Sequence, residues 1–104
     1  MDVRIIFQGV RESPWMQSYL ESKIEKLDRY VPVNSEVTIF LSEIEAEIKI
    51  KTPKHQYSFS SQGSDLFETF SRVFEAAAKF LRNEHAKLKV RIHRKFTEAE
   101  GFLL

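Results

Sequence analysis

The side chains most able to do chemistry in this sequence are cations gathered toward its end. Residues 79–95 hold seven lysines and arginines against a single acid, Glu84, so this segment carries a net charge of +6 in a chain whose total is +1. Clustered positive charge attracts anionic polymers even where the total charge is near zero. The alternative is a solvated helix end, whose negative dipole pole two or three cations would complement. Seven cations exceed that need and favour an anionic partner.

A long amphipathic helix is expected to present these cations. Asp65 is suited to be its N-cap, with Glu68 as capping-box partner, and Gly63 allows a flexible turn before it. At about 100° per residue, one face collects the apolar residues Leu66, Phe70, Val73, Phe74, Ala77, Leu81 and Leu88. The candidate binding cations outside that stripe are Arg72, Lys79, Arg82, Lys87, Lys89, Arg91, Arg94 and Lys95.

The end of this helix is open to two interpretations. Val90 and Ile92 are β-branched and alternate with polar residues, which lowers helix propensity and favours an end near Lys89. The residues beyond would then be an extended basic arm that orders on the anionic partner. Alternatively, the helix runs to about Lys95 and projects beyond the sheet. We expect one domain over residues 1–95 and a flexible tail over 96–104.

Composition limits the class of protein. The chain has 104 residues, of which 42% are apolar, with three glycines and three prolines, so we expect a single compact domain. The absence of cysteine excludes disulfides and thiolate chemistry. No apolar run approaches the roughly 20 residues of a membrane span. The start, MDVRIIFQ, has an acid at position 2 and is not typical of a signal peptide. A cytoplasmic protein without membrane contact is expected.

An earlier helix has two unlike flanks. Ser13 as N-cap and Pro14 at the first helical position predict its start, and Pro32 its end. Its expected buried stripe is Met16, Leu20, Ile24, Leu27 and Val31. One flank carries Trp15, Tyr19, Lys23, Lys26 and Tyr30, and the other carries Glu21, Glu25 and Asp28. Aromatics between lysines can stack on bases, but at such positions they more often seal the rim of a core. The lysines indicate that one edge of this helix faces an anionic partner.

Segments with the periodicity of strands precede and follow the earlier helix in the sequence. Residues 3–7, 37–42, 44–51 and 55–61 alternate apolar and polar side chains with period two. The turn at 42–45 is poorly specified because it lacks Gly, Pro and Asn, whereas Thr52, Pro53 and Lys54 mark a clear turn. Closely joined strands pair antiparallel. The prediction is an α+β fold of order β-α-β-β-β-α, a four-stranded mixed sheet with two helices packed on one face.

Several of these segments resemble a known family. The segments are GVRESPWMQSYLESKIEKLDRY, AEIKI and QGSDLFETF, and the most specific piece is the junction Gly63, Ser64, Asp65, Leu66, Phe67. Lys23, Lys26, Leu27, Arg29 and Tyr30 look like the basic end of the first helix in that family. Over about residues 1–92, the chain resembles the short form of the ribosome hibernation-promoting and ribosome-associated inhibitor family.

The resemblance implies a function. It implies binding to rRNA of the small ribosomal subunit, in the channel of mRNA and tRNA, to silence translation under stress or in stationary phase. We expect no cofactor, no small-molecule substrate and a monomer when free. The extra C-terminal dimerisation domain of the family's long form is expected to be absent. From the resemblance and the clustering of charge together, the expected RNA-contacting residues are Lys23, Lys26, Arg29, Arg72, Lys79, Arg82, Lys87, Lys89, Arg91, Arg94 and Lys95. The basic face has fewer such side chains than is usual in the family. Where the family usually has lysine or glutamine, this chain has Ala76, Phe80, Asn83 and His85. The connection between the second and third strands is also shorter.

Two other classes compete with this interpretation. An enzyme is not expected, because His85 and His93 lie about 80° apart around a helix, no acid lies near both, and His55 is remote in sequence. The acids Glu43, Glu45 and Glu47 are expected on a solvated sheet face or paired with Lys49 and Lys51. A protein-interaction module using the open sheet face or the apolar tail is the remaining alternative.

Overall fold

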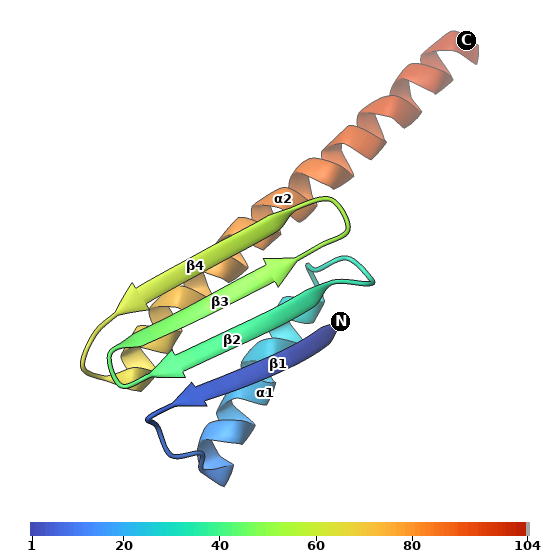
Figure 1. Cartoon of the computed structure of the whole chain (residues 1–104). Helices are drawn as coiled ribbons and strands as arrows, with labels where there is room; N and C mark the ends of the chain where they lie inside the picture. Colours follow the sequence, from blue (N-terminus) through green and yellow to red (C-terminus); the bar gives the residue numbers. More distant parts are fainter. Residues whose placement is uncertain (104) are drawn as a thin grey trace.

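The strands and helices follow the predicted order. The computed structural model describes the backbone of residues 1–103 and the side chains of residues 1–87. The elements are β1 (Asp2–Gln8), α1 (Pro14–Asp28), β2 (Glu36–Ser42), β3 (Glu45–Lys51), β4 (Gln56–Gln62) and α2 (Leu66–Leu103). The α+β order β-α-β-β-β-α is therefore confirmed (Figure 1).

The sheet is mixed and has helices on one face only. Its strand order is β1-β2-β3-β4, with β1 parallel to β2 and the other pairs antiparallel. The parallel pair is possible because α1 forms the crossover between its two strands. Figure 1 shows α1 and α2 behind the sheet, with both helices starting at the same end of the molecule. The other face of the sheet is left open.

The core lies between the sheet and the two helices. From the sheet, Val37, Ile39, Leu41, Ala46, Ile48 and Ile50 are buried. From the helices, the buried residues are Met16, Leu20, Leu27, Phe70, Val73, Phe74, Ala77 and Leu81, all of which belong to the two predicted stripes. Three other members of those stripes, Ile24, Val31 and Leu66, are half-buried, and the side chain of Leu88 is outside the described residues. The predicted apolar face of β1 is covered only in part, since Val3 is exposed and Ile5 is half-buried. β1 is an edge strand with a neighbour on one side only, and its apolar face is accordingly less covered than those of the inner strands.

Both predicted helix starts are confirmed by side-chain caps. The Ser13 hydroxyl accepts a 3.1 Å bond from the Met16 N–H, and Pro14 occupies the first turn. The Asp65 carboxylate accepts bonds from the N–H groups of Phe67 and Glu68 at 3.0 and 3.2 Å. Each cap satisfies N–H groups that have no partner within the helix. The starting points of α1 and α2 are thereby fixed locally.

Gly63 leaves room for the start of α2. A Cβ at this position would lie 2.6 Å from the Thr69 hydroxyl oxygen and 2.7 Å from an Arg72 guanidinium nitrogen. The arginine can move, but Thr69 is fully buried and its hydroxyl donates a 2.6 Å bond to the Asp65 carbonyl. Close approach, rather than flexibility, is therefore the reason that glycine fits here.

Replacing Gly63 with alanine should destabilise the domain by about 1–3 kcal/mol, because the new methyl group overpacks a fixed contact. Urea unfolding measures this loss, with Ser64→Ala as the neighbouring control. In a Thr69→Ala background the same substitution should be milder, because the obstructing hydroxyl is gone. An equal loss in both backgrounds would contradict the steric explanation.

The poorly specified turn between β2 and β3 is closed by a serine. The Ser42 hydroxyl accepts a 3.1 Å bond from the Glu45 N–H and donates a 3.4 Å bond to the Glu45 carbonyl. A hydroxyl that bonds the backbone in this way takes the place of the usual turn residues. The Ile44 carbonyl also accepts a bond of 2.9 Å from the Gly63 N–H, which ties this turn to the segment before α2.

The helix end predicted near Lys89 is wrong. The backbone of α2 is helical from Leu66 to Leu103, and Figure 1 shows its second half extending beyond the sheet. Adding a residue to an existing helix requires no new nucleation, so two β-branched residues need not end it. The flexible tail predicted over 96–104 falls on residues whose side chains lie outside the described set, and it stays a prediction.

Candidate nucleic-acid interface

A basic groove lies between the two helices. It is a hollow of about 600 Å³. Its lining residues are Lys23, Lys26, Arg29, Tyr30, Phe74, Glu75, Ala76, Ala78, Lys79 and Arg82. Five of these are predicted contact cations, and they face one carboxylate, that of Glu75. We call this hollow, with Lys23, Lys26, Arg29, Lys79 and Arg82, the basic groove.

Helical spacing explains how the cations meet. On α1, Lys23 and Lys26 are three residues apart, and Arg29 follows three later as the C-cap residue. On α2, Lys79 and Arg82 are also three apart, so each set forms one edge of its helix. Since both helices start at the same end of the molecule, the last turns of α1 lie beside the middle of α2 (Figure 1). The two basic edges therefore border one hollow.

Aromatic rings support Lys23 at the groove. Its ammonium lies 5.3 Å from the ring centre of Phe74 and 5.6 Å from that of Tyr19. A cation within about 6 Å of an aromatic face is attracted to it, which restricts the side chain without neutralising its charge. Tyr30 also lines the groove, and its ring packs edge-on against His85 at 5.9 Å. The charge of Lys23 is thus held in place and remains available to an anion.

Small residues keep the groove open. Ala76 and Ala78 line it, and Ala76 is exposed. In the sequence, Ala76 counts only as a missing cation of the basic face. In the structure its short side chain provides space in which a ligand could lie between the two basic edges. Reasoning from sequence misses this role, because only the pairing of the helices puts Ala76 between the cations.

The remaining predicted cations lie elsewhere. Arg72 is near the start of α2, where its guanidinium donates a 3.4 Å bond to the Gln62 carbonyl. Lys87 pairs with Glu84 at 3.3 Å on the exposed surface of α2. Neither residue lines the basic groove. The side chains of four further predicted cations, Lys89, Arg91, Arg94 and Lys95, are outside the described residues. The structure therefore brings five of the eleven predicted residues together.

The aromatic flank of α1 mainly seals the core, as predicted for Tyr19 and Tyr30. Tyr19 is half-buried, and its hydroxyl shares a 2.7 Å hydrogen bond with the Ser71 hydroxyl. Its ring packs against Phe67 and Phe70 at centroid distances of 5.5 and 5.9 Å. This bond and these contacts tie the flank of α1 to α2. They also fix the separation of the helices beside the basic groove.

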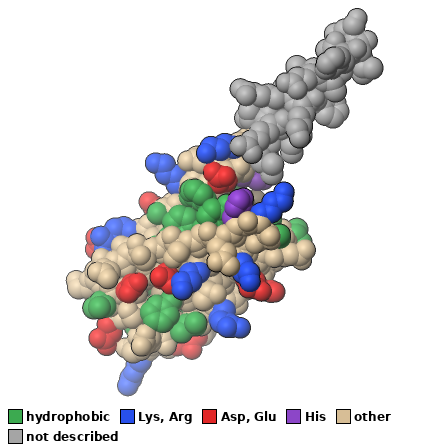
Figure 2. All heavy atoms as spheres, turned by 45° about the horizontal axis from the view of Figure 1, so that its top comes forward, with side chains coloured by type: hydrophobic (Ala, Val, Ile, Leu, Met, Phe, Trp, Pro, Cys, Tyr) green, Lys and Arg blue, Asp and Glu red, His purple; other side chains and the backbone are tan. Residues whose placement is uncertain are grey.

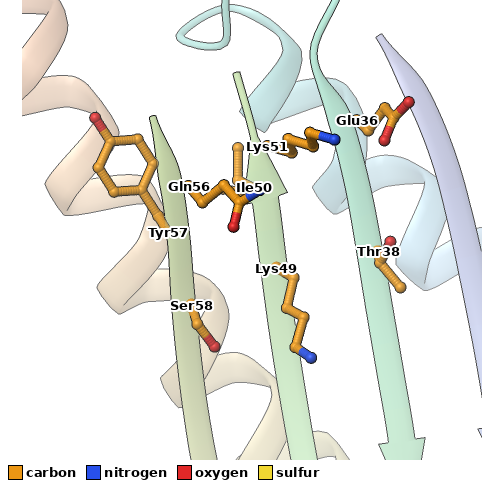
Figure 3. Close-up of a pocket in the computed structure, with 8 residues that line it drawn as sticks. All are labelled: Glu36, Thr38, Lys49, Ile50, Lys51, Gln56, Tyr57 and Ser58. Carbon is orange, nitrogen blue, oxygen red and sulfur yellow. The ribbon is translucent and has the colours of Figure 1, made fainter. Parts of the chain in front are cut away.

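The open face of the sheet carries charges of both signs. A hollow of about 450 Å³ on this face is lined by Lys49, Lys51 and Glu36, by neutral polar residues and by Ile50 (Figure 3). Lys49 pairs with Glu47 at 3.4 Å, as the alternation of charges predicts. Figure 2 shows positive and negative side chains interspersed on the face turned to the viewer. This face therefore presents no single sign of charge to a polyanion.

Membrane-spanning helices and metal sites are both absent from the described part of the chain. Neither helix, over its described residues, combines the length and the apolar composition that a bilayer crossing needs. Among the same residues, no three His, Asp or Glu side chains are grouped so that they could hold a metal ion.

Comparison with known proteins supports one family. No curated protein sequence matches the chain. Among solved structures, the N-terminal domain of Protein Y from Thermus thermophilus matches with a TM-score of 0.69 and 21% identity, covering 80% of this chain and 98% of that one. A ribosomal subunit interface protein from Coxiella burnetii matches with a TM-score of 0.55 and 19% identity, covering 83% and 99%. At such identities these likenesses establish the fold.

The sequence itself establishes the family. The model of the family described as Sigma 54 modulation protein / S30EA ribosomal protein matches residues 3–89, which is most of the chain. The resemblance identified from the residues is confirmed by this match. The protein therefore belongs to the Sigma 54 modulation protein / S30EA ribosomal protein family.

Proposed function

We propose that this protein binds rRNA of the small ribosomal subunit through its basic groove and silences translation in the cytoplasm under stress or in stationary phase. The observation that carries the proposal is the convergence of five cations from α1 and α2 on one hollow. Membership of a family described as ribosomal supports a ribosomal partner, and so does the likeness to a subunit interface protein of Coxiella burnetii.

The groove has the properties that a phosphate contact needs. Arginine presents a planar fork that can hold two phosphate oxygens, and Arg29 and Arg82 lie on opposite edges of the groove. Lysines act as point charges, and Lys23 and Lys26 continue the α1 edge. RNA helices are recognised largely by phosphate contacts and shape. A rigid groove with positive edges therefore suits an RNA backbone without reading a particular sequence.

A second candidate is a protein-interaction module that uses the open sheet face. The hollow beside Glu36, Lys49 and Lys51 favours it, because mixed charges suit a polar protein surface better than a polyanion. If the protein had this second function, the basic groove would take no part in binding the partner protein.

Sucrose-gradient fractionation of starved cells separates the two candidates. We expect the protein to sediment with small subunits and whole ribosomes, and to be released by raised salt, because phosphate contacts weaken as salt rises. Addition of the purified protein to a reconstituted translation reaction should lower the yield. A protein that stays in the slowest fractions at low salt would refute the ribosomal partner and favour the interaction module.

A further inference from the structure

Trp15 is an exposed aromatic residue that the core does not explain. It is the single tryptophan of the chain, it lies in the first turn of α1, and 63% of it is exposed. Tyr19 and Tyr30 on the same flank are both half-buried. Burial of a large aromatic side chain is a main source of its stabilising effect, so an indole left this open contributes less than its size allows.

Neighbouring rings hold the Trp15 indole without covering it. Phe67 packs edge-on at a centroid distance of 4.3 Å and an angle of 69°, and Tyr19 lies almost parallel to it at 6.1 Å. Tyr19 is itself fixed by its bond to Ser71 and by its contact with Phe67. The plane of the indole is therefore set before any ligand arrives, which lowers the entropy lost on binding.

The indole is linked to the basic groove through Tyr19, although Trp15 itself does not line the groove. Tyr19 contacts Trp15 on one side, and the Lys23 ammonium lies over the Tyr19 ring at 5.6 Å. Trp15 and Lys23 are eight residues apart on one helix, which is about 12 Å along its axis. A nucleic-acid strand advances about 3.4 Å per nucleotide when stacked, so a few nucleotides cover this distance. A strand held in the groove could thus place a base at Trp15.

We propose that Trp15 is a stacking platform for an unpaired RNA base whose backbone continues into the basic groove. The inference rests on the proposed function and adds a contact of different chemistry. Every base has a π-face, so the indole would accept any base, while the cations hold the phosphates. Single-stranded and looped RNA is the substrate class, because bases inside a duplex already stack on each other.

The test uses the fluorescence of Trp15, which reports directly because the chain has no other tryptophan. A single-stranded oligoribonucleotide should quench the emission of the full-length protein, and a strand of equal length and charge without bases should quench it far less. Small ribosomal subunits should quench it as well. Absence of base-dependent quenching by the oligonucleotide would overturn the stacking role, whatever the subunits do.

Affinity measurements on variants provide the second arm. Trp15→Leu should weaken binding to small subunits by about 5- to 100-fold, whereas Trp15→Phe should keep most of the affinity, because the ring remains. The slope of log K against log salt should not change, since no phosphate contact is removed. Val33→Ala, at a site that is 82% exposed, is the control for a change at an exposed apolar residue. Urea unfolding should show each variant to be folded.

The outcomes separate the two proposals. Equal losses in Trp15→Leu and Trp15→Phe would indicate a contact of shape, as with a protein surface, and would overturn the stacking role. Subunit binding that is unaffected in both variants would overturn it too, while leaving the proposed function intact. If the protein did not bind ribosomal subunits but its fluorescence were still quenched in a base-dependent way, the proposed function would be refuted. The stacking role would then be supported for RNA of another source.

Discussion

Replacing Lys23, Lys26, Lys79 and Arg82 with glutamine should lower the affinity for small ribosomal subunits by about 10²- to 10³-fold at a salt concentration of about 0.15 M. Each phosphate contact contributes about 0.7–0.9 to the slope of log K against log salt, because binding releases condensed counterions. Removing four contacts should therefore flatten that slope by roughly three units. Titrations at several salt concentrations measure both quantities.

A matched control removes the same charge elsewhere. The quadruple glutamine variant of Arg4, Lys49, Lys51 and Lys54 changes the net charge equally, but its four sites are exposed and do not line the basic groove. Its salt slope should stay near that of the unaltered protein. Glu75→Gln provides a control of opposite sign, since removing the groove carboxylate should strengthen binding. If both quadruple variants changed the slope equally, the cause would be total charge and the groove would not be the contact site.

Reversing the charge of the two lysines of α1 should also weaken binding to small subunits strongly, although only two residues are changed. Lys23→Glu with Lys26→Glu places two carboxylates at the edge of the groove, facing Lys79 and Arg82. Two phosphate contacts are lost and two repulsions are added, so we expect a loss of about 10²-fold or more. Binding to small subunits at low salt would measure it.

The opposite flank of α1 supplies the control for this reversal. Glu21 and Glu25 are exposed and do not line the groove. Their replacement with glutamine makes the chain more basic by two charges, so binding should be unchanged or slightly stronger. Similar losses from both double variants would indicate that α1 itself is disturbed, and circular dichroism would identify that case.

The sequence predicts the start of each helix better than its end. Ser13 and Asp65 carry side-chain oxygens that can bond the first free N–H groups, and this local signal is sufficient. The predicted end of α1 is at Pro32, but the helix ends at Asp28 and the chain turns through Asn34 at a φ of +68°. Where a helix must stop to reach the next strand depends on the position of that strand, which periodicity does not reveal.

The basic groove could be predicted only in part for a similar reason. Amphipathicity places Lys23 and Lys26 on one flank of α1, and Lys79 and Arg82 outside the apolar stripe of α2. It gives no information on which turn of one helix lies beside which turn of the other. Arg72 satisfies the same helical criterion as Lys79, yet the structure places it beside Gln62, away from the groove. Only the pairing of the two helices distinguishes these residues.

Convergence of the cations has a consequence for the free domain. Five positive charges around one hollow, with Glu75 as the single carboxylate, repel each other whenever no ligand is present. The hydrophobic core must offset this self-repulsion, so the groove lowers the conformational stability of the protein that carries it. The quadruple glutamine variant of the groove should accordingly unfold at a higher urea concentration than the unaltered protein. A surface whose neutralisation both strengthens the fold and removes the ligand would indicate that selection has kept it for binding, against stability.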